Sequence, residues 1–243
     1  MGLDDRKRQK KLERRAAKRK ERRRELRHAE PQSLAEQITL ASSGSVVHCC
    51  VQATLTEEGI GGLLISREAP QQRVAFAVLL VDVLCLGIKD AFGNLVSRGE
   101  YRQFYEQFSQ RHPLIALTPA SGRQLVEDAL AYAGKFGIGP HADFHRVKGI
   151  FAGIEAAGAT RRFDFGGEDG KPYFIAGPND SPYRCRQVIQ LLQQHCPAGE
   201  FSFLIPAGDG ADLDEITAAN DHEDAYDAPP LKSPSSMPRL ERR

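Results

Sequence analysis

Long apolar runs are missing from this chain. None reaches the roughly 18 residues that a membrane-spanning helix requires, and the longest candidate, residues 74–86, is interrupted by Asp82. The sequence therefore predicts no membrane span. No apolar stretch follows the charges near the N-terminus either, so we expect no secretory signal peptide.

Cysteine patterns that hold zinc are also absent. The chain contains no Cys-x-x-Cys pair, and Cys185 and Cys196 would lie about 16 Å apart along one helix, too far to share an ion. An odd total of five cysteines with no expected signal peptide is typical of reduced thiols in a cytoplasm. We therefore expect buried free thiols and a cytoplasmic location.

Recognised catalytic motifs are lacking as well. There is no serine elbow, dinucleotide fingerprint or HExxH. The glycines and lysine of GGEDGK (residues 166–171) are similar to a phosphate loop, but one residue is missing and Pro172 stands where Ser or Thr belongs. A helix expected from Pro182 would place Arg184 and Arg186 near its N-terminus, where anions bind. A phosphate contact and a plain hairpin followed by a capped helix both fit, so the sequence leaves enzymatic activity undecided.

What the chain does have is an uneven charge distribution. Residues 1–30 hold 14 Lys/Arg and 6 Asp/Glu, a net of +8, whereas residues 206–243 hold 4 and 9. The near-neutral total of +1 therefore hides a basic head and an acidic tail. Such asymmetry suggests contact with a polyanion. The basic side chains are Arg6, Lys7, Arg8, Lys10, Lys11, Arg14, Arg15, Lys18, Arg19, Lys20, Arg22, Arg23, Arg24 and Arg27.

The charge distribution divides the chain into three parts. Residues 1–31 form a basic arm, helical or disordered, because its residues favour helix but offer no apolar face to bury. Residues 32–205 form one core domain, and residues 206–243 form an acidic disordered tail. The arm also has no aromatic or apolar face for a membrane surface. Nucleic acid, the ribosome or an acidic protein remain as its partners, beside a purely solubilising role.

The core domain reads as α+β. Residues 46–53, 60–67 and 73–81 are strands, the last two forming an antiparallel hairpin, and residues 83–94 are a short strand or loop broken by Gly87 and Gly93. Helices follow at 98–110, at 121–135 with Ser121 as cap, and at 143–154. A hairpin of 163–165 with 173–175, a helix at 182–195 capped by Ser181 and a strand at 201–205 complete it. Strands cluster before helices, so we predict one antiparallel hairpin sheet packed by helices.

Two polar clusters could carry chemistry. In GPHADFHRV, His141 and His145 are four residues apart and could hold a metal if a helix begins at Pro140, or His141 lies in the loop if Asp143 is the cap. Asp82 and Asp90 bracket the end of an apolar strand, where paired acids could bind Mg²⁺ or simply stabilise a turn. The enzyme interpretation requires Asp82 or Asp90 to meet His141 in space, which makes these three the catalytic candidates.

Two stretches resemble a known group of proteins. RVAFAVLLVDVLCLGIKDAFG and FDFGGEDGKPYFIAGPNDSPYRCR resemble segments of uncharacterised bacterial hypothetical proteins with no assigned activity. The resemblance covers roughly residues 59–196. It implies one bacterial cytoplasmic domain and carries over no catalytic residue.

These observations favour an accessory protein that binds nucleic acid through its basic arm. RNA or the ribosome is favoured slightly over DNA, because no DNA-reading helix motif is visible. One alternative is a metal-dependent phosphodiesterase or other hydrolase, and another is a protein–protein adaptor that binds an acidic partner. No cofactor is predicted, and a divalent metal enters only under the hydrolase alternative.

Overall fold

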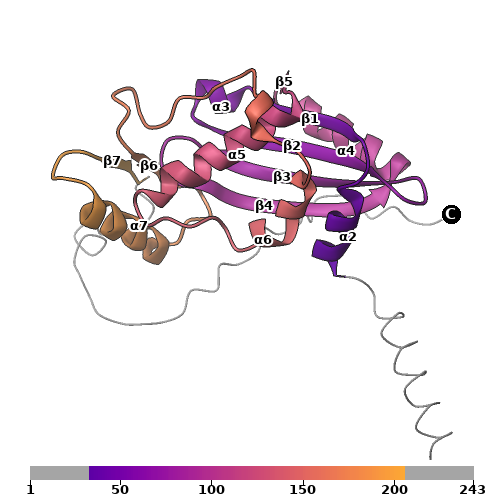
Figure 1. Cartoon of the computed structure of the whole chain (residues 1–243). Helices are drawn as coiled ribbons and strands as arrows, with labels where there is room; N and C mark the ends of the chain where they lie inside the picture. The colour runs from indigo at the N-terminus through magenta and orange to yellow at the C-terminus, as the bar shows by residue number, and fades with distance from the viewer. Residues whose placement is uncertain (1–32, 206–243) are drawn as a thin grey trace, which may run out of the picture. The chain divides into compact units, whose positions relative to one another are not determined.

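A five-stranded antiparallel sheet is the centre of residues 33–205, which are the residues that the computed structural model describes (Figure 1). The strand order is β4–β3–β2–β1–β5. The strands are β1 (Val46–Gln52), β2 (Ile60–Ala69), β3 (Arg73–Asp82), β4 (Gly87–Ser97) and β5 (Leu114–Ala116). The α+β class is confirmed, while the predictions for residues 1–31 and 206–243 lie outside the described residues.

The β2–β3 hairpin matches the prediction. Its register runs from Ile60 opposite Asp82 to Ala69 opposite Arg73. Both strands are buried over most of their length, which explains their continuous apolar sequences. The connecting turn places Gln72 in the left-handed region at φ 55°.

Strand β4 corrects the expectation of a short, glycine-broken segment. It is 11 residues long and pairs along the whole of β3. Gly93 does not interrupt it, because the glycine permits a close approach: a Cβ there would lie 2.7 Å from the Phe76 carbonyl oxygen and 2.8 Å from Val147. One bulge shifts the register between Leu80 and Val81.

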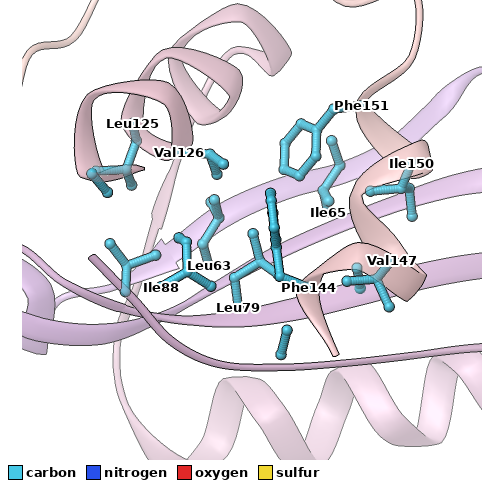
Figure 2. Packing of buried hydrophobic residues seen from close by; sticks show 14 of the residues in the cluster. Leu63, Ile65, Leu79, Ile88, Leu125, Val126, Phe144, Val147, Ile150 and Phe151 are labelled. Atoms are coloured by element: carbon cyan, nitrogen blue, oxygen red, sulfur yellow. The ribbon is translucent and has the colours of Figure 1, made fainter. Parts of the chain in front are cut away.

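One face of the sheet is covered by α2 (Leu34–Ala41), α5 (Pro119–Gly134), α6 (Phe144–Val147) and the 3-10 helix η1 (Lys148–Phe151). Figure 2 shows side chains from α5, α6 and η1 packed on alternate residues of the strands. Burying them supplies the main apolar contribution to stability. The labelled side chains are Leu63, Ile65, Leu79, Ile88, Leu125, Val126, Phe144, Val147, Ile150 and Phe151.

The opposite face is covered by α4 (Arg98–Arg111), which was predicted at 98–110 and packs its aromatic residues against the sheet. Phe104 stacks on Phe76 with ring centroids 4.4 Å apart. Ser97 caps this helix through a reciprocal capping box with Glu100. The turn from β4 into α4 is thereby fixed by local sequence.

A second, smaller core lies beside the main sheet. Strand β6 (Tyr173–Ile175) pairs in parallel with β7 (Ser202–Leu204), and α7 (Pro182–His195) connects them. The predicted hairpin of residues 163–165 with 173–175 is therefore wrong, because β6 takes its partner from beyond a helical crossover. The prediction of α7, capped by Ser181, is confirmed.

Helix boundaries required two further corrections. Thr118, not Ser121, caps α5, because Pro119 suits the first helical position. The predicted helix over 143–154 is only the short α6 followed by η1. Arg67 donates to the carbonyl oxygens of Ile150 and Ala152, at the end of η1 and just beyond it.

Several short elements were not predicted from the sequence. They are α2, β5, α3 (Thr54–Glu57) and η2 (Ala156–Gly158). In the described part of the chain no helix is both long and apolar enough to cross a membrane.

Candidate functional site

Two of the three catalytic candidates meet at the outer edge of β4. The backbone N–H of His141 donates to the Ile88 carbonyl oxygen at 3.0 Å, which fixes the loop before α6 against the strand. The imidazole Nδ1 then lies 3.7 Å from Asp90 Oδ1. The condition that the sequence could not test, contact between Asp90 and His141, is thus met.

Asp143 completes this cluster. Its Oδ2 lies 3.9 Å from His141 Nδ1, and its Oδ1 accepts a hydrogen bond of 2.9 Å from Arg146. It occupies the N-cap position of α6, but its side chain makes no capping hydrogen bond. We call Asp90, His141 and Asp143 the β4-edge cluster. Sequence reasoning named all three residues and considered Asp143 as a helix cap in one of two alternatives.

The protonation of His141 decides which contacts the cluster makes. In the present geometry Nδ1 accepts the backbone N–H of Asp143 at 3.3 Å, which places the proton of the neutral ring on Nε2. A second proton on Nδ1 would face both carboxylates. Burial raises the pKa of Asp90, and the nearby imidazole partly offsets that rise.

The β4-edge cluster is accessible from solvent. The three side chains remain 14 to 24% exposed, so solvent or a bound molecule can reach them. Both carboxylates lie on the Nδ1 side of the imidazole, at 3.7 and 3.9 Å, which is beyond direct hydrogen-bond distance. A metal finds fewer ligands here: among residues 33–205 no group of three His, Cys, Asp or Glu side chains is arranged to hold one.

His145 stands apart from the cluster. Helix α6 begins at Phe144, so His141 lies in the preceding loop and the two histidines do not share a helical face. His145 is exposed. The loop alternative, with Asp143 at the cap position, describes this segment.

Asp82 also lies outside the cluster. Its Oδ1 accepts the backbone N–H groups of Leu84 and Cys85, both at 2.9 Å, so it is a turn acid. The nearby charge that acts on it is Lys89, which pairs with Asp180 at 2.7 Å. Of the two acids predicted to meet a histidine, only Asp90 does so.

The glycine-rich segment forms a closed turn. The Gly167 N–H donates to the Lys171 carbonyl oxygen at 2.7 Å. The Lys171 ammonium lies 3.1 Å from Glu200 and 3.7 Å from Asp169. Two carboxylates already neutralise this lysine, which favours an ordinary turn before the capped helix α7 over a phosphate contact. The hairpin expected in that alternative does not form.

One polar network escaped the sequence analysis. The Tyr101 hydroxyl, carried by α4, lies 2.6 Å from Ser66 Oγ and 2.8 Å from His48 Nδ1. The His48 ring stacks on Tyr105, with centroids 4.0 Å apart, and burial lowers its pKa. The network joins β1, β2 and α4. Its only sequence signal was that His48 lies on the same face of β1 as buried Cys50.

The five thiols are free, as predicted, and four of them are buried. Burial raises the pKa of Cys50 to about 11 and that of Cys49 to about 12. Thiolates are the reactive form, so these two side chains are packing residues rather than nucleophiles.

The 14 basic residues proposed to contact nucleic acid lie outside the described residues. No protein-family model matches this chain, and no curated protein or solved structure is significantly similar to it. These findings agree with the resemblance to uncharacterised proteins without an assigned activity.

Proposed function

We propose that this protein binds nucleic acid, RNA or the ribosome in preference to DNA, through its basic N-terminal arm in a bacterial cytoplasm. The observation that carries the proposal is the net charge of +8 within 30 residues. Lysine and arginine side chains that contact phosphates release condensed counterions, and this release drives association without a shaped pocket. The α+β domain supplies whatever selectivity exists.

The test is the salt dependence of binding to single-stranded RNA and duplex DNA. If about five phosphates are neutralised, log K falls with log salt at a slope of about −3.5 to −4.5. A chain lacking residues 1–30 loses most of its affinity and most of this slope. A chain with the arm residues in scrambled order is the matched control and keeps both, because the interaction is one of charge.

Two results would overturn this proposal. Unchanged RNA and DNA binding by the truncated chain would show that the arm is not the binding element. Tight binding to polyglutamate, with none to either nucleic acid, would instead support the adaptor alternative.

A second candidate function rests on the β4-edge cluster. Asp90, His141 and Asp143 could serve a phosphodiesterase or other hydrolase, with His141 moving the proton. Mg²⁺ commonly binds through one or two carboxylates, with water and substrate phosphate as its other ligands. A divalent ion at Asp90 and Asp143 would therefore not require a third protein ligand.

Hydrolysis of a chromogenic phosphodiester in the presence of Mg²⁺ or Mn²⁺, together with calorimetry of metal binding, tests this candidate. We expect His141→Ala and Asp90→Asn to abolish hydrolysis, and His145→Ala, an exposed control on the same segment, to leave it unchanged. Equal loss of metal binding in both histidine variants would instead support a metal site formed by His141 and His145. No hydrolysis and no binding heat would reject the site.

A further inference from the structure

Asp82 carries an unusual buried oxygen. The residue is fully buried, and its Oδ1 accepts two backbone N–H groups. Its Oδ2 has no hydrogen-bond partner, and it is the only buried side-chain oxygen or nitrogen of this kind among the described residues. A buried polar atom without a partner is costly, and most so when it carries charge. The protonated carboxyl is therefore the form that this position accommodates best.

The turn that Asp82 stabilises connects the two cores. Val83 belongs to the main core, whereas Cys85 and Leu86 belong to the smaller one. The Leu84 carbonyl oxygen accepts the N–H of Tyr173 at 3.0 Å, at the start of β6. Residues 82–86 thus hold β6, β7 and α7 against the end of β3.

A second connection involves Lys89 of β4. Its ammonium lies 2.7 Å from Asp180, in the loop before α7, and donates to the Ile175 carbonyl oxygen at 3.3 Å. Lys89 is also the positive charge that acts on Asp82. The ammonium of Lys89 therefore acts on Asp82 from a distance while it is paired directly with Asp180.

Other titratable groups surround this junction. Cys85 in the turn and Tyr132 of α5 both sense the charge of Asp82. Four other titratable groups lie close enough to act on Cys85 or Tyr132: Lys89, Asp169, Arg184 and Cys196. Lys89 is the member whose charge favours the ionised form of Asp82.

We propose that the protonation of Asp82 controls how firmly β6, β7 and α7 are attached to the main sheet. While the carboxyl is protonated the turn stays closed and holds these elements, and loss of the proton favours an open turn in which they are released. This regulatory role goes beyond nucleic-acid binding and does not depend on it. It rests on the buried, partnerless Oδ2 and on the position of its turn between the two cores.

The direction of the pH effect follows from the pKa of Asp82 in the closed and in the open turn. Burial raises the pKa of Asp82 from 3.8 to about 6 while the turn is closed, whereas in the open turn the pKa returns to its ordinary value. Below pH 3.8 both states are protonated and the attachment is strongest. Between these two values each pH unit increases the equilibrium constant for opening the turn by up to about tenfold. Over the whole range this constant rises about a hundredfold.

Hydrogen–deuterium exchange of the full chain from pH 4 to 7.5, corrected for the intrinsic rate, measures this opening. We expect amides of β6 and α7 to show the hundredfold rise, and those of β2 and β3 to lack it. Asp82→Asn retains the Oδ1 acceptor but cannot ionise, so its β6 and α7 amides show no such rise. Glu106→Gln, an exposed carboxylate on α4, is the matched control and behaves like the unmodified chain.

Lys89→Met provides a second variant that leaves Asp82 in place. Without the nearby positive charge the ionised form is less favoured, so the rise in opening moves to higher pH. The proposal is rejected if Asp82→Asn keeps the full pH dependence or if β2 and β3 respond as strongly as α7. It is also rejected if Lys89→Met leaves the pH range of the rise in opening unchanged.

Discussion

Replacing Arg67 by methionine tests whether one buried cation organises the main core. Arg67 lies on β2 and is 6% exposed. Its Nε donates to the Ile150 carbonyl oxygen at 2.8 Å, and Nη2 donates to that of Ala152 at 2.9 Å. Its Nη1 donates to the carbonyl oxygens of Gly44, at 3.0 Å, and Ser42. One side chain thus joins the loop after α2, β2 and the end of η1.

The expected loss of stability follows from these contacts. Hydrogen bonds to a charged group contribute about 1.5–3 kcal/mol each, but burying the guanidinium offsets part of that sum. Burial also lowers the pKa of Arg67, the direction expected for a desolvated cation. The carbonyls of Ser42, Gly44 and Ala152 lie on residues that water can reach, whereas Ile150 is fully buried. We therefore expect Arg67→Met to cost about 3 kcal/mol.

The free energy of unfolding of each variant is measured by urea titration, and the values are compared where the dependence on urea concentration is the same for all variants. Arg67→Lys is the matched control: its ammonium has three donors but no fork, so we expect it to recover roughly half of the loss. A domain of this size is stable by about 5–15 kcal/mol, so the effect is measurable without unfolding the protein. A cost below about 1 kcal/mol for Arg67→Met would refute the reasoning.

Three further substitutions test other parts of the fold. Tyr101→Phe removes the hydroxyl that joins Ser66 to a histidine, and should lower the free energy of unfolding by about 1–2 kcal/mol in urea titrations. Leu79→Ala opens a cavity at a fully buried position and should cost about 2–5 kcal/mol; a smaller loss would mean that the core collapses around it. Gln72→Gly removes the strain of a left-handed backbone at a residue with a side chain. It should raise the free energy of unfolding by up to about 1 kcal/mol, seen as a higher thermal midpoint, whereas Gln72→Ala should not.

The sequence was sufficient wherever local patterns decide structure. The β2–β3 hairpin followed from two apolar runs around a short turn, and α7 from Ser181 and Pro182. Phe144, Val147 and Phe151 are buried, although the helix predicted over 143–154 is shorter than expected.

Only the tertiary structure decided features that depend on a distant partner. The partner of β6 lies beyond α7, and the segment after α6 is held by Arg67, which is 83 residues from Ile150 in the sequence. For the same reason the sequence could place Asp90 and His141 among the candidates but could not bring them together.

The charge of the arm and the alternation of apolar residues are properties of the chain itself, so the sequence determined the expectation of polyanion binding and the α+β class. Whether a carboxylate stabilises a turn or faces a histidine depends on strand register and loop contacts. Asp82 and Asp90, eight residues apart, look alike in the sequence, yet one is a buried turn acid and the other lies beside an imidazole. The turn after β3 presents two backbone N–H groups to Asp82, whereas the hydrogen bond from His141 to Ile88 holds an imidazole beside Asp90, and this second contact joins residues more than 50 positions apart.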